Sequence, residues 1–182
     1  MGLWFNKENL AKENQVSFTE LYANASDSES WTCVIKSALE QSGGFDILVN
    51  NAGITYNALF QMSTRDWIDK TLDVNFVAPY IFTQYIVKLM VKNGYGNIVN
   101  IASSAAIDGN SGRSIYGASK ASVVCATKAL AEELGVKGIR ANSIAPGITQ
   151  TDMLSSMTDE VIRNTIMATD SKQPGTVEDT AN

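Results

Sequence analysis

Tyr116 and Lys120 stand four positions apart in a stretch whose apolar residues recur at helical spacing. On a helix this spacing brings the two side chains onto one face, about one turn apart. A phenol ordinarily titrates near pH ~10, so it must become more acidic to donate a proton at neutral pH, and a nearby ammonium acts in that direction. The pair is therefore a candidate acid/base site, although a Tyr-x-x-x-Lys pair taken alone also occurs in helices without function.

Three turns that follow β-rich runs hold residues suited to ligand contact. Ser103 comes thirteen residues before Tyr116 and directly after the run 97–102. At the carboxyl edge of a parallel sheet, where α/β folds bind their ligands, its hydroxyl could hold a substrate oxygen. Asn50-Asn51-Ala52-Gly53 and Pro146-Gly147 follow two other such runs, and their small residues permit close approach of a flat ligand. Each of these two turns by itself is equally typical of an ordinary loop.

The elements that must position these residues alternate between short β-rich runs and longer helical patterns, as βαβ units with a parallel sheet require. The sequence predicts strands over residues 16–22, 45–50, 97–102 and 139–145. It predicts helices over 27–41, from the capping motif Ser63-Thr64-Arg65-Asp66 to Gly94, and over 115–134 with Gly135 as the C-terminal cap. Pro79 lies inside the second helix and cannot donate the hydrogen bond that the Asn75 carbonyl would accept. No repeat or linker divides residues 1–182, which indicates one α/β domain.

The composition excludes several classes of chemistry. The chain has no histidine, which rules out Ser-His and Cys-His nucleophiles and His-ligated metals, and Cys33 and Cys125 lack the spacing of a zinc site. A formal charge of −5 without blocks of like sign disfavours nucleic-acid binding. The most apolar stretch, 81–91, is interrupted by Gln84 and Lys88 and is short for a membrane span. We expect a cytoplasmic protein in a reducing compartment, without metal, membrane or nucleic-acid partner.

Taken together, the motifs resemble the short-chain dehydrogenase/reductase family, in its 3-oxoacyl-[acyl-carrier-protein] reductase-like branch. The resemblance implies a Rossmann-like, doubly wound parallel sheet in a single domain. It also implies NAD(P)-dependent hydride transfer between nicotinamide and a small ketone or secondary alcohol, by a homodimer or homotetramer assembled through helices 64–92 and 116–134. The motifs that carry it are Asn50-Asn51-Ala52-Gly53, Leu72-Asp73-Val74-Asn75, Ser103, Tyr116-Gly117-Ala118-Ser119-Lys120 and the run from Pro146 to Met153.

The resemblance assigns catalytic roles to four residues. Tyr116 would be the general acid that protonates the carbonyl oxygen, and Ser103 would hydrogen-bond that oxygen. Lys120 would make the phenol more acidic and bind the nicotinamide ribose. Asn75 would hold a water that connects Lys120 to solvent, with the carbonyl freed by Pro79 as an acceptor for that water.

The resemblance also assigns cofactor contacts, with NADP(H) favoured and NAD(H) as the alternative. Tyr116 and Lys120 belong to this set as well as to the catalytic one. Asn24 and Ala25 would cover the adenine, and Asn51, Ala52 and Gly53 would line the ribose on the adenine side. Thr149 and Thr151 would contact the nicotinamide carboxamide beside Gly147.

The sequence departs from the family pattern at its start, where the glycine-rich turn that cradles the pyrophosphate has no counterpart. The spacing of the motifs predicts that the first βα unit and the last strand are lacking. Two scenarios follow: a partial copy of an ordinary enzyme, or a catalytically weak or inactive fragment that serves as a binding or assembly partner. A flavodoxin-like binding module is a rival from another class, and it would not need Ser103, Tyr116 and Lys120 to converge.

Residues 54–62, 105–113 and 153–173 are expected to form the walls of the substrate pocket. Their apolar side chains predict a moderately apolar ligand. An acyl-carrier protein is acidic and would prefer basic docking residues, whereas Asn93 and Asn97 flank the end of the long helix, so a generic ketone ranks above an acyl-carrier substrate. The apolar residues concerned are Phe60, Met62, Ile107, Met153 and Met157.

Overall fold

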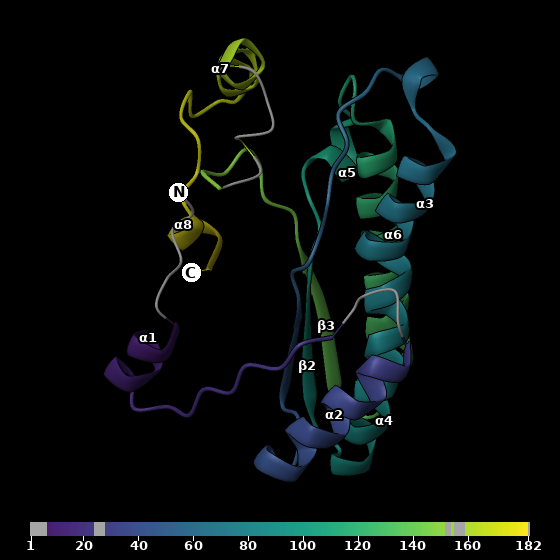
Figure 1. Cartoon of the computed structure of the whole chain (residues 1–182), viewed down its shortest axis with the longest axis vertical. Coiled ribbons are helices and arrows are strands. Elements are labelled where there is room, and N and C mark those ends of the chain that lie inside the picture. Colours follow the sequence, from purple (N-terminus) through teal and green to yellow (C-terminus); the bar gives the residue numbers. More distant parts are fainter. Residues whose placement is uncertain (1–6, 24–27, 152–153, 155–158, 182) are drawn as a thin grey trace.

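A computed structural model of the chain describes residues 7–23, 28–151, 154 and 159–181 (Figure 1). Its elements alternate between helices and short parallel strands, as the sequence predicts. In chain order they are α1 (Lys7–Glu13), α2 (Ser28–Ser42), β1 (Ile47–Asn50), the 3₁₀ helix η1 (Phe60–Met62), α3 (Arg65–Leu72), the π-helix η2 (Asp73–Val77), α4 (Ala78–Asn93), β2 (Gly96–Ile101), α5 (Ala105–Asp108), α6 (Ser114–Gly135), β3 (Ile139–Ile144), α7 (Asp159–Ala168) and α8 (Val177–Ala181).

The sheet contains three parallel strands in the order β1-β2-β3. Ile47 pairs with Asn97 at one end of the β1–β2 ladder, and Ile101 pairs with Ile144 at the end of the β2–β3 ladder. Since the strands are parallel and nearly in register, their carboxyl ends meet at one edge of the sheet. The predicted parallel α/β architecture is thereby confirmed, and the three turns singled out in the sequence lie at that edge.

Helices α2, α4 and α6 cover one face of the sheet, and α1, α7 and α8 lie on its other side (Figure 1). The core lies between the sheet and the first group of helices, where each large apolar side chain removed from water contributes about 1.5–3 kcal/mol. On the opposite face, Ile47 and Val49 of β1 remain 62% and 55% exposed. The core cluster consists of Ile35, Ile86, Met90, Ile98, Leu134, Ile139 and Ala141.

The predicted strand over residues 16–22 is wrong. This segment has no regular secondary structure and joins no ladder, and Val16 and Tyr22 are 61% and 84% exposed. An extended segment becomes a strand only when its N–H and C=O groups pair with a neighbour, and within the described residues none lies beside it. β-forming composition alone therefore misled the prediction here.

The long predicted helix forms, but it contains a π-helical turn. Thr64 caps its start, since the Thr64 side chain accepts a hydrogen bond from the Trp67 N–H at 3.3 Å, and Gly94 ends it in the left-handed conformation at φ 69°. Just before Pro79, the Ala78 N–H donates to the Asp73 carbonyl, five residues back. Because Pro79 cannot donate to the carbonyl four residues before it, a wider register at this point costs little. Asn75 lies in the middle of the π turn.

The continuous helical stretch Arg65–Asn93 is long and apolar enough, by length and composition, to cross a membrane. This differs from the expectation, which rested on the shorter apolar stretch 81–91. In this fold, however, Ile86 and Met90 of that stretch belong to the core. The core helix of a globular protein meets the same criterion, so packing of Ile86 and Met90 against the sheet accounts for part of the composition.

Helix α6 extends from Ser114 to Gly135, one residue beyond the predicted range at each end. Its C-cap is Val136 rather than Gly135, and the residue with a left-handed backbone is Gly138, at φ 78°. The turn after the helix is thus longer than expected. Helices α1, α5, α7 and α8 were not predicted, because each is short.

Candidate active site

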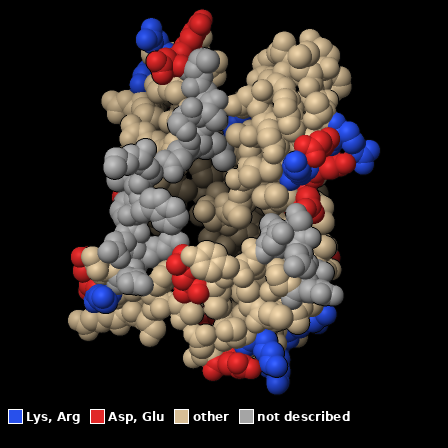
Figure 2. Space-filling model, in the orientation of Figure 1, with Lys and Arg blue, Asp and Glu red and all other residues tan. Residues whose placement is uncertain are grey.

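A cavity of about 760 Å³ opens at the carboxyl edge of the sheet. One face of the sheet contributes Val49, Val99, Ile101 and Ile144 to its wall. The turns after all three strands, helix α6 with the residues just before it, and helices α7 and α8 contribute the rest. In the space-filling view the molecule is hollowed between the part that carries α7 and α8 and the helices around α3, and uncharged atoms dominate the walls in view (Figure 2). This volume lies within the range of about 300–1,000 Å³ that small-molecule and cofactor sites occupy.

Ser103, Tyr116 and Lys120 all line this cavity, as the sequence analysis predicted. Ser103 follows β2, and its Oγ accepts a hydrogen bond from the Ala105 N–H at 3.2 Å, so the hydroxyl can still donate its own proton. Tyr116 and Lys120 extend from α6 and are 7% and 4% exposed. A flavodoxin-like binding module would not require these three side chains to converge, so their convergence counts against that alternative.

The Lys120 ammonium is held deep in the site by the backbone of β2. Its Nζ donates to the Ile101 carbonyl at 2.6 Å. Burial lowers the pKa of Lys120 below its ordinary value, because a charged ammonium loses hydration there. Gly53 gives this packing room, since a Cβ at position 53 would lie in tight contact, 3.3 Å from Nζ and 3.4 Å from Asn75 Oδ1.

Asn75 ties the turn after β1 to helix α6. Its side chain is 1% exposed, accepts from the Ile54 N–H at 2.8 Å and donates to the Ile54 carbonyl at 2.9 Å. The same amide donates to Ser119 Oγ at 2.9 Å, and Ser119 donates to the Tyr116 carbonyl at 2.7 Å. The residue expected to hold a water thus also positions the helix turn that carries Tyr116.

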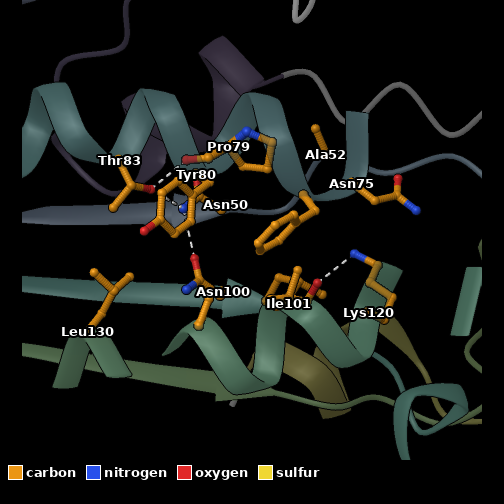
Figure 3. Close-up of a pocket in the computed structure, with 13 residues that line it drawn as sticks. Asn50, Ala52, Asn75, Pro79, Tyr80, Thr83, Asn100, Ile101, Lys120 and Leu130 are labelled. Carbon is orange, nitrogen blue, oxygen red and sulfur yellow. Dashed lines mark hydrogen bonds between the residues drawn. The ribbon is translucent and has the colours of Figure 1, made fainter. Parts of the chain in front are cut away.

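A second cavity of about 30 Å³ lies beside Asn75, Pro79 and Lys120 (Figure 3). The close-up shows Lys120 bonded to Ile101 at one end, and Asn50, Asn100 and Thr83 together at the other. A cavity of this size is large enough for one water molecule, and its largely apolar lining includes the polar side chains of Asn75 and Lys120. The space next to Pro79 therefore fits the expected position of a water near Lys120.

Polar side chains connect the walls of this small cavity. Asn50 Nδ2 donates to Asn100 Oδ1 at 2.7 Å and to Thr83 Oγ1 at 2.9 Å. Asn100 in turn donates to Thr127 Oγ1 at 2.8 Å. The amides of two neighbouring strands are thereby fixed to α4 and to α6, the helix that carries Tyr116 and Lys120.

The predicted cofactor residues divide between the two cavities. Asn51, Gly53, Gly147, Thr149 and Thr151 line the large cavity together with Tyr116 and Lys120. Ala52 lines the small cavity instead. Asn24 and Ala25 lie outside the described residues, so their assignment stays a prediction.

The predicted substrate walls are partly wrong. No residue of 54–62 is among those that line the large cavity in the described part of the chain, and Phe60, Met62 and Ile107 point to solvent with 81%, 63% and 75% exposure. Met153 and Met157 lie outside the described residues. Because the open face of the sheet borders the cavity, its branched side chains supply the apolar surface, joined by Leu154 and Val177.

Arg113 lies at the end of the predicted wall segment 105–113, but the sequence analysis assigned this residue no role of its own. It stands directly before α6, lines the large cavity, and its Cζ lies 4.4 Å from the centroid of the Tyr116 ring. Burial lowers the pKa of Arg113, while hydrogen-bonding and Coulombic interactions with Tyr116 act in the opposite direction. The spacing of three residues between Arg113 and Tyr116 at the start of a helix was the available signal.

Comparison with known proteins agrees with this geometry. The short chain dehydrogenase family matches residues 6–161. A 3-oxoacyl-[acyl-carrier-protein] reductase of Vibrio cholerae is 37% identical over 138 residues, which are 75% of this chain and 56% of that protein. A 3alpha-hydroxysteroid dehydrogenase of Mediterraneibacter gnavus is 35% identical over 191 residues, covering 100% of this chain and 76% of that protein.

Among solved structures, "ElxO with NADP Bound" superposes with a TM-score of 0.83 at 30% identity, covering 98% of this chain and 75% of that one. The chain belongs to the short-chain dehydrogenase/reductase family of oxidoreductases, with a Rossmann-like fold. It spans just over half the length, 56%, of the Vibrio cholerae reductase that it matches.

Proposed function

We propose that the protein transfers a hydride between NADP(H) and a ketone or secondary alcohol, as a 3-oxoacyl reductase-like enzyme with Tyr116 as its acid/base. The observation that carries the proposal is that Tyr116, Ser103 and Lys120 line one cavity at the carboxyl edge of the sheet. Ligands of open α/β sheets bind at this edge. NAD(H) is the alternative cofactor.

The nicotinamide supplies or accepts the hydride when it is bound. In the direction of reduction, Tyr116 donates its phenolic proton to the substrate oxygen, and Ser103 donates a hydrogen bond to the same atom. Lys120 lines the same cavity one helical turn further along α6. A positioned general acid of this kind contributes about 10² to 10⁴ in rate.

The nicotinamide half of a cofactor fits the residues on the cavity wall. Gly147 has open space where a Cβ would stand, so it presents bare backbone to the cavity beside Thr149. Lys120 offers an ammonium for the ribose hydroxyls. The choice of NADP(H) rests on ElxO, whose solved structure contains bound NADP.

The substrate class follows from the names of relatives. Both the 3-oxoacyl reductase and the 3alpha-hydroxysteroid dehydrogenase are named for a carbonyl or alcohol substrate. A small ketone is the substrate proposed here, ahead of an acyl chain carried by a protein. The hydroxysteroid dehydrogenase makes a steroid ketone the second candidate, since its match covers 100% of the chain.

Assembly into a homodimer or homotetramer in the cytoplasm is proposed through helices 64–92 and 116–134. Val77 and Tyr80 on the first of these stretches are about two-fifths exposed, at 40% and 41%. Sedimentation velocity of the wild type is expected to give a species larger than a monomer, and Tyr80→Glu is expected to shift it toward the monomer. A wild-type monomer at high concentration would contradict this assembly.

The test of the activity follows NADPH oxidation by wild type, Tyr116→Phe and Tyr85→Phe with a panel of ketones. Tyr116→Phe is expected to lose at least about 10²-fold in kcat, since the ring remains but the proton donor is gone. Tyr85 lies on α4 outside both cavities, so Tyr85→Phe serves as the matched control. Retained turnover in Tyr116→Phe would overturn the assigned acid, and wild type that neither binds NADPH nor turns over would favour the inactive binding partner.

A further inference from the structure

The guanidinium of Arg113 lies at the reacting end of the large cavity. Its Cζ is 4.4 Å from the centroid of the Tyr116 ring, and both residues line the cavity together with Ser103. The Arg113 carbonyl accepts from the Gly117 N–H at 2.9 Å, and its own N–H donates to the Asn110 carbonyl at 3.0 Å. The backbone of Arg113 is therefore fixed at the start of α6.

The charges around this end of the cavity are all positive. Arg113 and Lys120 are the only charged residues on its wall within the described part of the chain, and Tyr116 is the only other titratable one. The chain as a whole carries −5. Lys120 is held at its buried end by the Ile101 carbonyl, whereas Arg113 lies against the ring of Tyr116, where a substrate oxygen would meet the phenol.

Contact with the Tyr116 ring also prepares the guanidinium for recognition of an anion. A guanidinium that packs on an aromatic ring loses little further freedom when its planar fork binds a carboxylate through two parallel hydrogen bonds. Arg113 is half-buried, and burial lowers its pKa. The buried guanidinium has lost part of its favourable hydration. An anion bound beside it would replace part of that lost stabilisation.

We propose that Arg113 selects a carbonyl substrate that carries a carboxylate next to the reacting centre, such as a short 3-oxo acid. The reacting oxygen would lie against Tyr116 and Ser103, and the carboxylate would bind Arg113. This inference rests on the proposed function and narrows its substrate class from ketones in general to oxo acids. It distinguishes the site from one that accepts a 3-oxoacyl thioester, in which no carboxylate is present at that position.

The test compares acetoacetate with its methyl ester, which differ in the charge at this position. NADPH oxidation is measured for wild type, Arg113→Gln, Arg113→Lys and Arg163→Gln. Wild type is expected to prefer the acid by roughly 10- to 100-fold in kcat/KM, which is the range of a charge-assisted hydrogen-bond pair. The acid-to-ester ratio should fall to about 1 in Arg113→Gln and take an intermediate value in Arg113→Lys, which keeps the charge but loses the fork.

Arg163 is an exposed arginine on α7 outside the cavity wall, so Arg163→Gln should leave the ratio at the wild-type value. A wild-type preference for the ester, or a ratio that Arg113→Gln does not change, would overturn the inference while the proposed function stands. If Arg113 served a cofactor phosphate instead, Arg113→Gln would raise the KM for NADPH and leave the ratio intact, which also overturns it.

Failure of wild type to reduce any ketone of the panel, these two compounds included, would defeat the proposed function. Where acetoacetate and its ester are both left unreduced, direct binding decides on Arg113. Calorimetric titration with acetoacetate and with its methyl ester measures recognition without turnover. Tighter binding of the acid that weakens at least about 10-fold in Arg113→Gln supports the anion site. Equal binding of the two compounds overturns it.

Discussion

Lys120 Nζ donates a 2.6 Å hydrogen bond to the carbonyl oxygen of Ile101, the last residue of β2. The bond ties the helix that carries Tyr116 to the end of the central strand, two residues before Ser103. It also keeps an ammonium in a place where burial opposes its charge. A residue held in an electrostatically unfavourable position in this way is characteristic of functional sites, where stability and activity conflict.

Lys120→Met is expected to reduce NADPH binding and turnover while leaving the protein as stable as wild type, or more stable, at neutral pH. Burial of the charge destabilises the folded state by its full amount at any pH where Lys120 is protonated in both the folded and the unfolded protein. This destabilisation disappears once the pH exceeds the unfolded-state pKa of about 10.4. The stability of wild type should therefore rise relative to the variant as pH increases from neutrality toward that value.

Urea unfolding at a series of pH values measures this difference. Lys128→Met, on an exposed position of the same helix, is the control and should show no such trend. A wild type that loses stability relative to Lys120→Met on going to alkaline pH would mean that the ammonium stabilises the fold.

Asn75→Ala is expected to lower the free energy of unfolding by about 1–3 kcal/mol, because the N–H and carbonyl of Ile54 and the hydroxyl of Ser119 all lose a partner. Denaturant unfolding measures the loss. Asn142→Ala, on an exposed position of β3, should change stability far less. Similar losses in the two variants would contradict the bridging role of Asn75.

Thr127→Val is expected to be more destabilising than Thr71→Val. Both threonines are buried and donate to the carbonyl four residues earlier, but Thr127 alone of the two accepts from Asn100. Removing that acceptor leaves a buried amide N–H unsatisfied, at a cost of about 1–3 kcal/mol. Thermal unfolding of the two variants gives the comparison, and equal melting temperatures would show that the Asn100 bond contributes nothing.

Gly117→Ala is expected to destabilise the protein by about 1–3 kcal/mol, because the new Cβ would lie 2.8 Å from the Ala105 carbonyl oxygen where α5 meets α6. Gly135→Ala, at the end of the same helix, meets nothing within 4 Å and should stabilise by up to about 1 kcal/mol. Opposite signs for the two variants in chemical unfolding are the expected result. A neutral Gly117→Ala would indicate that α5 shifts easily.

Elements were predicted correctly where the local sequence pattern is compatible with only one kind of structure. The run 97–102 became the central strand because helices and neighbouring strands cover it, and Gly94 ended the long helix because a left-handed backbone suits glycine. The prediction failed for residues 16–22, where a similar composition found no partner strand. A strand forms only when its backbone hydrogen-bonds to a second segment, so the composition of one segment is not enough to predict it.

The amino-acid sequence by itself determined which groups are available: a phenol and an ammonium one helical turn apart, a hydroxyl thirteen residues earlier, and no histidine to offer other chemistry. Only the tertiary structure decided that Arg113 joins them, that Phe60 points to solvent, and that Asn75 is bonded to Ser119. Periodicity fixes neighbours along one helix, since the geometry of a turn is constant. Contacts between elements depend on how helices pack against the sheet, and no spacing along the chain encodes that distance.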